Sequence, residues 1–131
     1  MSERNALIID DEPDVTKYLE AVLVDHGWKV RTANTADDGL VLAREKRPDA
    51  VLLDMMMPER GGLSVIVELR KDPELSSVPI VVVSGIQATL TGDFRNFLSR
   101  FKHRQPDAFL DKPIDPEELI ATLDRLTAGA E

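Results

Sequence analysis

The chain contains the run Asp49-Ala50-Val51-Leu52-Leu53-Asp54-Met55-Met56-Met57-Pro58, in which an apolar segment meets a carboxylate and, shortly after it, a proline. An unbroken apolar run of this kind predicts a parallel strand that is buried on both faces. We expect residues 50–53 to form that strand and Asp54 to stand at its carboxyl end, where open α/β sheets bind ligands. A carboxylate at a strand end is more often a turn-former or a helix cap, so the function of Asp54 depends on what the other strands bring to the same edge.

The segments on both sides of this run alternate between strand and helix patterns. Short apolar runs predict further strands at residues 6–9, 28–33, 78–83 and 108–110. Apolar residues at helical spacing predict helices at residues 13–26, 35–46, 62–71, 91–102 and 116–126. This alternation favours a doubly wound α/β fold, in which right-handed crossovers place five helices on the two faces of a five-stranded parallel sheet.

Cap and turn residues support three of these helix starts. Pro13 suits the first turn of a helix, because the missing N–H would have no partner there. Thr35, followed three residues later by Asp38, resembles a capping box. Asp115 is a cap residue before the last predicted helix, and Pro116 stands at the first position of that helix.

Length and composition narrow the class of protein. A chain of 131 residues, 43% hydrophobic and 31% charged, is expected to form one globular domain. The formal net charge of -8 disfavours direct nucleic-acid binding, and the lack of cysteine excludes thiolate metal sites and disulfides. No run approaches the length of a membrane span and residues 1–6 do not resemble a signal peptide, so we expect a cytoplasmic protein without membrane contact.

Polar side chains stand at the carboxyl ends of four of the five predicted strands. Because these ends share one edge of a parallel sheet, residues far apart in the sequence can converge there. They are Asp10, Asp11, Asp54, Ser84 and Lys112. Carboxylates that meet in this way repel one another, which raises the pKa of at least one of them unless a cation is bound. Oxygen ligands without His or Cys favour Mg²⁺, or Mn²⁺, over zinc.

The same set of groups suits the transfer of a phosphoryl group. Its equatorial oxygens carry negative charge and need cationic partners, which a metal ion and Lys112 would supply. Asp54 would then be the nucleophile and would form an aspartyl phosphate.

Four short motifs make the chain resemble the receiver domains of response regulators over nearly its full length. They are Ile9-Asp10-Asp11-Glu12, Leu53-Asp54-Met55-Met56-Met57-Pro58 with Gly62 beyond it, Val83-Ser84-Gly85, and Asp111-Lys112-Pro113. The resemblance implies a flavodoxin-like fold with strand order 2-1-3-4-5, a single receiver domain over residues 1–131, and no output domain. It also implies a switch that catalyses its own phosphorylation and dephosphorylation and signals by protein binding.

The resemblance assigns roles to individual residues. Asp54 would accept phosphate from a phosphohistidine of a sensor histidine kinase or a phosphotransfer protein. Asp10, Asp11, Asp54 and the backbone carbonyl of Met56 would hold the metal ion. Lys112 would contact the phosphoryl group, and the Lys112–Pro113 bond would be cis. Ser84 and Phe109 stand at the two positions that change conformation on phosphorylation.

Simpler interpretations exist for several of these residues. Lys112 is also explained as a solvated charge, Phe109 as a packing residue, and Glu12 as a helix-terminal acid rather than a ligand. A phosphorylation-independent pseudo-receiver is the main alternative function, although the set of acids, Ser84 and Lys112 is intact. A flavodoxin-like FMN protein is a weaker alternative, because no Ser/Thr/Gly-rich phosphate loop follows the first strand.

The chain departs from the family pattern at three places. Gly61 replaces an acid before Gly62, Arg60 replaces an apolar residue, and the span from Ser84 to Lys112 is several residues longer than usual. Within that span, residues 94–104 contain no acid; their basic residues are Arg95, Arg100, Lys102, His103 and Arg104. We expect residues 91–104 to dock a downstream partner with an acidic surface, including a second copy of this chain; the alternative is a solvated face.

Overall fold

Five strands and four helices form within the residues that the computed structural model describes, 3–55, 62–84 and 105–128. In chain order they are β1 (Asn5–Ile9), α1 (Pro13–Asp25), β2 (Lys29–Ala33), α2 (Ala36–Glu45), β3 (Ala50–Asp54), α3 (Gly62–Lys71), β4 (Ile80–Ser84), β5 (Ala108–Asp111) and α6 (Pro116–Thr127). The predicted α/β alternation is confirmed. The helix expected at residues 91–102 lies outside the described ranges, so the count of five helices stays a prediction.

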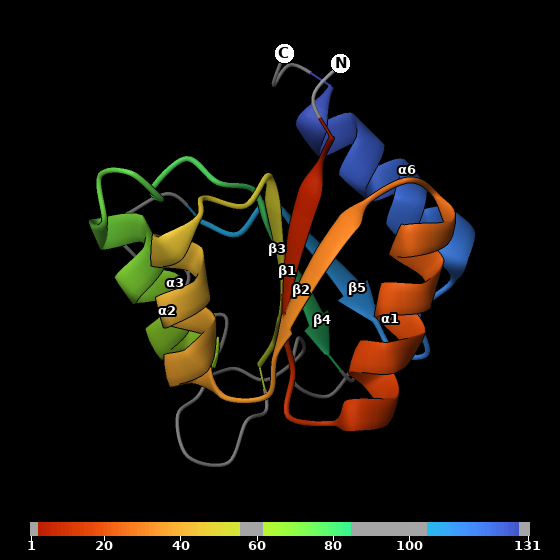
Figure 1. Ribbon diagram of the computed structural model, residues 1–131, viewed down its shortest axis with the longest axis horizontal. Coiled ribbons are helices and arrows are strands. Elements are labelled where there is room, and N and C mark those ends of the chain that lie inside the picture. Colours follow the sequence, from red (N-terminus) through yellow and green to blue (C-terminus); the bar gives the residue numbers. More distant parts are fainter. Residues whose placement is uncertain (1–2, 56–61, 85–104, 129–131) are drawn as a thin grey trace.

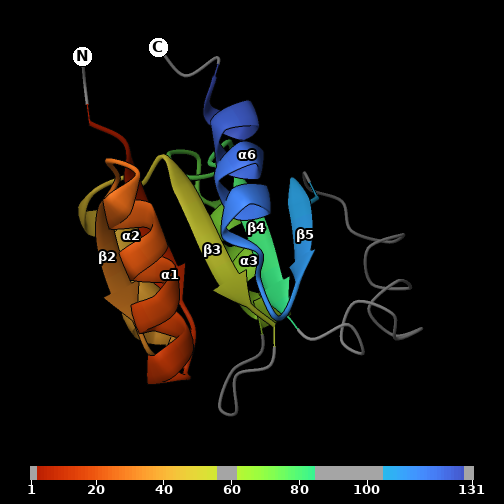
Figure 2. The ribbon, with the colours of Figure 1, turned by 90° about the vertical axis from the view of Figure 1, so that its right-hand side faces the viewer.

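The strands form one parallel sheet with the order β2-β1-β3-β4-β5, which confirms the predicted strand order. Figure 1 shows α2 and α3 on one face of this sheet and α1 and α6 on the other. In Figure 2 the strands run from β2 at one edge to β5 at the other, with α1 and α6 in front. β3 therefore lies at the centre of the sheet, and its carboxyl end carries Asp54.

Two apolar cores, one on each face, explain why β1 and β3 lack polar alternation. Every residue of both strands is buried. Leu7 and Leu53 pack with α2 and α3, whereas Ile8 and Leu52 pack with α1 and α6. Successive side chains of a strand point to opposite faces, so a strand covered on both sides is apolar at its interior positions, and the polar residues Asn5 and Asp54 stand at the ends.

Caps appear where the sequence placed them at two helices. The Asp38 amide donates to Thr35 Oγ1 at 3.1 Å, and the Glu117 amide donates to Asp115 Oδ1 at 3.1 Å. At the end of α1, Gly27 adopts a φ of 87°, a left-handed conformation that glycine reaches without a steric penalty.

Two strands begin later than their apolar runs suggested. β2 begins at Lys29, because the Trp28 amide donates to Leu23 O at 3.0 Å and completes the end of α1 instead. β4 begins at Ile80 rather than at residue 78, because the Val78 amide turns back to Leu75 O at 3.1 Å and Pro79 has no amide hydrogen. Local turns therefore take the first residues of both runs.

Candidate functional site

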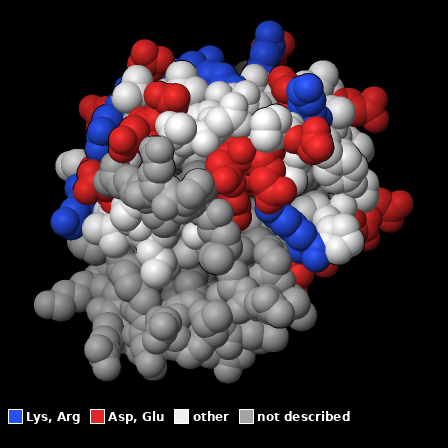
Figure 3. Space-filling model, turned by 90° about the horizontal axis from the view of Figure 1, so that it is seen from below, with Lys and Arg blue, Asp and Glu red and all other residues white. Residues whose placement is uncertain are grey.

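Four carboxylates meet at the carboxyl edge of the sheet. β1 and β3 are neighbours in register, with Ile9 opposite Leu53, so Asp10 and Asp54 extend from adjacent strands. Asp11 and Glu12 continue from Asp10 toward α1. Carboxylate oxygens of the four acids all lie within 4.8 Å of one another, and Figure 3 shows a compact acidic patch at this edge. We call this group, Asp10, Asp11, Glu12 and Asp54, the acid cluster.

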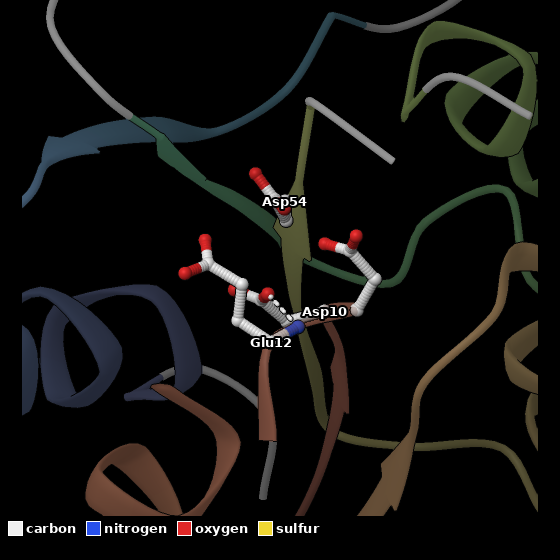
Figure 4. Close-up of side chains that lie close together, drawn as sticks. Asp10, Glu12 and Asp54 are labelled. Carbon is white, nitrogen blue, oxygen red and sulfur yellow. Dashed lines mark hydrogen bonds between the residues drawn. The ribbon is translucent and has the colours of Figure 1, made fainter. Parts of the chain in front are cut away.

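Burial distinguishes the members of the acid cluster. Asp10 is 1% exposed and Asp54 is 2% exposed, whereas Asp11 is half-buried and Glu12 is exposed. In Figure 4 the side chains of Asp10, Glu12 and Asp54 come from the ends of β1 and β3 and the loop after β1. Carboxylates as buried as Asp10 and Asp54 are rare unless they are paired or bind a metal ion.

Backbone groups hold Asp10 in place. Its amide donates to Ala33 O at 3.1 Å, and its Oδ1 accepts a hydrogen bond from the Glu12 amide at 2.9 Å, drawn as a dashed line in Figure 4. Its Oδ2 is buried and accepts no hydrogen bond from the described residues. That oxygen forms an ion pair with Lys112 Nζ, 3.4 Å away.

Lys112 lies beside the acid cluster, as its position after a parallel strand predicts. It follows β5, and its Nζ lies 3.4 Å from Asp10 Oδ2, 3.4 Å from Glu12 Oε1 and 3.9 Å from Asp54 Oδ1. The Lys112–Pro113 peptide bond is cis, as the resemblance implied. With its side chain 23% exposed and three carboxylates around it, Lys112 is more than a solvated surface charge.

The electrostatics of the site differ in one respect from the sequence argument. Burial is the main cause that raises the pKa of Asp10 above its ordinary value, against the lowering effects of the Glu12 amide and of Lys112. Repulsion from Glu12 adds only a smaller increase. For Lys112, burial by itself lowers the pKa, but Asp10, Asp54 and Glu12 together outweigh it and raise the pKa above its ordinary value.

The acid cluster fits a hard divalent cation. All its donors are carboxylate oxygens, the ligands that Mg²⁺ and Mn²⁺ prefer. The buried Asp10 Oδ2, which accepts no hydrogen bond among the described residues, is an oxygen that a cation would satisfy. Three members, Asp10, Asp11 and Asp54, match the predicted ligands; the fourth predicted ligand, the carbonyl of Met56, lies outside the described residues.

The start of α3 packs directly on the end of β3. The Gly62 amide donates to Met55 O at 3.3 Å. A Cβ on Gly62 would lie 2.8 Å from both Asp54 O and Met55 Cα, closer than side-chain carbons approach backbone atoms. Glycine at this position therefore lets α3 begin beside Asp54 without displacing the strand end that carries it.

The two predicted switch residues occupy the neighbouring strands. Asp54 is in register with Val83 on β4, so Ser84 stands one residue further along at the same edge, opposite Asp111 of β5. Phe109 lies on β5 opposite Val82 and is 40% exposed, which makes it one of the large apolar side chains that the fold leaves accessible. Residues 91–104, the predicted docking segment, lie outside the described ranges.

Sequence reasoning missed two contacts at this site. Glu12 is the N-cap residue of α1, but its side chain makes no cap hydrogen bond and pairs with Lys112 instead. Asn34, directly after β2, donates from Nδ2 to Asp10 O at 3.0 Å. The only sequence signal for Asn34 is its place after a predicted strand, at the same edge as the acids.

Comparisons with known proteins show which proteins this chain resembles. The model of the response regulator receiver domain family matches residues 6–124. Protein PilH of Pseudomonas aeruginosa is 36% identical over 123 residues, covering 94% of this chain and 97% of PilH. Response regulator Rre1 of Synechocystis is 36% identical over 125 residues, covering 93% of this chain and 51% of Rre1, so the chain spans about half the length of that relative.

A solved structure extends the comparison to the whole fold. The receiver domain of the sensor histidine kinase PA1611 from Pseudomonas aeruginosa, which holds a magnesium ion in its active site cleft, matches with a TM-score of 0.85. The match has 26% sequence identity and covers 98% of this chain and 100% of that domain.

Within the ranges that the structure describes, no helix is long and apolar enough to cross a membrane.

Proposed function

This chain belongs to the family of response regulator receiver domains, and we propose that it accepts a phosphoryl group on Asp54 and signals through phosphorylation-dependent protein binding. The donor is a phosphohistidine of a sensor histidine kinase or of a phosphotransfer protein. The observation that carries this proposal is the position of Asp54, a carboxylate only 2% exposed that lies 3.9 Å from a lysine ammonium and within the acid cluster.

Asp54 has the chemistry of the acceptor in this transfer. A carboxylate oxygen of Asp54 forms the new bond to phosphorus while the bond between phosphorus and the donor imidazole nitrogen breaks. The electron pair of that bond stays on the nitrogen, and an ionised carboxylate needs no base to activate it. Lys112, close to Asp54 Oδ1, offsets the negative charge that gathers on the phosphoryl oxygens.

The metal ligands of this proposal are Asp10, Asp11, Asp54 and the backbone carbonyl of Met56. When bound, Mg²⁺ or Mn²⁺ supplies positive charge that offsets the repulsion between these acids and the incoming phosphoryl group. The magnesium ion in the related PA1611 receiver domain supports this assignment. The residues of this chain orient the acids, since β1 and β3 fix Asp10 and Asp54 on adjacent strands.

Ser84 and Phe109 are the switch residues of the proposal. The Ser84 hydroxyl and the Lys112 ammonium both favour the state in which they reach the phosphoryl group, so phosphorylation shifts an existing equilibrium between two conformations. Phe109 follows that shift on β5, where its exposed ring alters the surface that partners contact.

The proposal is tested by incubating the protein with acetyl phosphate and Mg²⁺ and measuring its intact mass. We expect a single phosphoryl adduct. No adduct should form when EDTA has removed the cation, because the clustered carboxylates then repel the anionic donor. Restoring Mg²⁺ after EDTA should restore the adduct. A protein that binds Mg²⁺ but never gains the adduct, even from histidine kinases screened as donors, would instead be a phosphorylation-independent interaction module.

Residues 91–104 are the proposed output segment, on the ground of their charge. Four Arg and Lys side chains, one His and no acid stand between residues 94 and 104 of a chain whose net charge is -8. Rim charges of this kind mainly control the association rate and the choice of partner. We propose that the partner has an acidic surface, which a second copy of this acidic chain would also provide.

The charge-reversal variant Arg100→Glu/Arg104→Glu tests this segment. We expect it to gain the phosphoryl adduct like the wild type but to lose about tenfold or more in affinity for a phosphorylation-dependent partner or for itself. Sedimentation and pull-down with the beryllofluoride-activated protein measure the effect. Reversal of Lys46 and Arg47, exposed between α2 and β3, is the control. If the Arg100→Glu/Arg104→Glu variant binds as well as the control variant, the basic residues of 91–104 are only a solvated face.

A further inference from the structure

Asn34 ties Asp10 to the neighbouring strand, although it is exposed and carries no charge. Its Nδ2 donates to Asp10 O at 3.0 Å, while the Asp10 amide donates to Ala33 O at 3.1 Å. Both backbone polar groups of Asp10 are therefore bonded to two consecutive residues at the end of β2. Asp10, at 1% exposure, is the most deeply buried member of the acid cluster.

The hydrogen bond from Asn34 acts on the link between two proposed metal ligands. The Asp10 carbonyl and the Asp11 amide belong to one planar peptide unit, so holding the carbonyl fixes the orientation of that plane. The Asp10 side chain is held separately, because its Oδ1 accepts from the Glu12 amide at 2.9 Å. Together these bonds leave Asp10 Oδ2 as the oxygen presented to a ligand, since it forms an ion pair with Lys112 Nζ at 3.4 Å but accepts no hydrogen bond among the described residues.

We propose that Asn34 is a positioning residue that arranges the Asp10–Asp11 pair for divalent cation binding. This inference rests on the proposed function, since it assumes that the acid cluster binds a cation. Groups already held in the binding arrangement need no ordering when the ligand arrives, and partners that orient metal ligands contribute to affinity without contacting the metal. Loss of Asn34 therefore weakens cation binding while every ligand remains.

The test compares Mg²⁺ affinity by titration calorimetry in Asn34→Ala, Asn34→Gln and Thr35→Ala. We expect the dissociation constant of Asn34→Ala to rise about 3- to 10-fold, at or below the lower end of effects seen for residues that orient metal ligands. Asn34→Gln keeps the amide donor and should recover part of the affinity. Thr35→Ala is the matched control. It changes the residue next to Asn34 and removes the hydrogen bond that the Asp38 amide donates to Thr35 Oγ1, but it leaves the bond to Asp10 in place.

A second measurement separates positioning from general loosening of the loop. In phosphorylation by acetyl phosphate, Asn34→Ala should need more Mg²⁺ for its half-maximal rate but reach the wild-type rate at saturating Mg²⁺, since no reacting group has changed. Thr35→Ala should keep wild-type Mg²⁺ affinity even though losing its cap lowers its stability toward urea.

The possible outcomes distinguish the positioning role of Asn34 from the proposed metal site itself. Unchanged Mg²⁺ affinity in Asn34→Ala, or an equal loss in Thr35→Ala, would overturn the role of Asn34 and leave the proposed function standing. A wild-type protein that binds no Mg²⁺ would overturn the proposed metal site and, with it, this inference. A lower rate of Asn34→Ala at saturating Mg²⁺ with unchanged affinity would also contradict positioning.

Discussion

The Asp54→Asn variant should take up no phosphoryl group from acetyl phosphate, whereas the wild type takes up one. An amide has the shape of the carboxylate but lacks the anionic oxygen that attacks phosphorus, so the fold is retained and the nucleophile is lost. Asp54 ends β3 and is 2% exposed, and its neighbours on the adjacent strands hold it at the sheet edge. Intact-mass spectrometry measures the difference, and circular dichroism verifies that the variant is folded.

The control for this prediction is Asp14→Asn, which makes the same change of charge at an exposed position in the first turn of α1. Asp14 is outside the acid cluster, so this variant should gain the adduct at the wild-type rate. A phosphoryl adduct that persists in Asp54→Asn would assign the nucleophile to another acid of the cluster, Asp10, Asp11 or Glu12. Loss of the adduct in both variants would point to net charge instead of a specific nucleophile.

The convergence of the acids at one sheet edge could be predicted from the sequence, because two general rules of parallel sheets apply to it. Apolar runs such as residues 50–53 predict strands buried on both faces, and parallel strands bring their carboxyl ends to one edge. Asp10, Asp54 and Lys112 stand at the ends of three strands and meet in the structure, where Lys112 Nζ lies 3.4 Å from Asp10 Oδ2 and 3.9 Å from Asp54 Oδ1. Strand boundaries were less predictable, since Trp28 and Val78 bond to preceding turns.

Contacts that depend on tertiary geometry could not be predicted. The Asn34 side chain reaches a backbone carbonyl 24 positions away, and the Glu12 carboxylate pairs with a lysine 100 positions away. Neither contact follows from a periodicity or a motif spacing that could be recognised in the sequence. Repulsion between the acids was expected to raise the pKa of at least one of them; for Asp10 the pKa is raised mainly by burial, which the sequence does not quantify.

Arg70 is the largest such omission, because composition places arginines on the surface. Its side chain is 0% exposed, and it ties the end of α3 to the segments that precede β4 and β5. Nη1 donates to Ser76 O at 2.9 Å and to Val78 O at 2.7 Å. Nη2 donates to Gln105 O at 3.1 Å and to Asp107 Oδ2 at 3.1 Å.

Asp107 joins this arginine to the sheet. Its Oδ2 also accepts a hydrogen bond from the Ile80 amide at 2.8 Å, at the first residue of β4, and its side chain is 10% exposed. Removing Arg70 would therefore take a cation from a nearly buried carboxylate and hydrogen-bond donors from three backbone carbonyls. That cost exceeds the value of the pair itself, because the charge left behind is poorly solvated.

The Arg70→Met variant is accordingly expected to lose about 3–5 kcal/mol of unfolding free energy, the range for breaking one side of a buried ion pair. Urea unfolding measures it, provided that the slope with denaturant stays unchanged. Arg44→Met is the matched control, since Arg44 is 49% exposed and pairs at 3.4 Å with Glu68 and 3.7 Å with Asp72. Its loss should stay below about 1 kcal/mol.

The double variant Arg70→Met/Asp107→Asn distinguishes an unpaired charge from lost packing. With the Asp107 carboxylate replaced by a neutral amide, the charge that Arg70 neutralised is gone, and the double variant should be more stable than Arg70→Met alone. If the two substitutions instead add, the destabilisation comes from the backbone carbonyls and the packing of the arginine stem. Equal losses in Arg70→Met and Arg44→Met would contradict the buried role, because the two arginines would then contribute alike despite their opposite exposure.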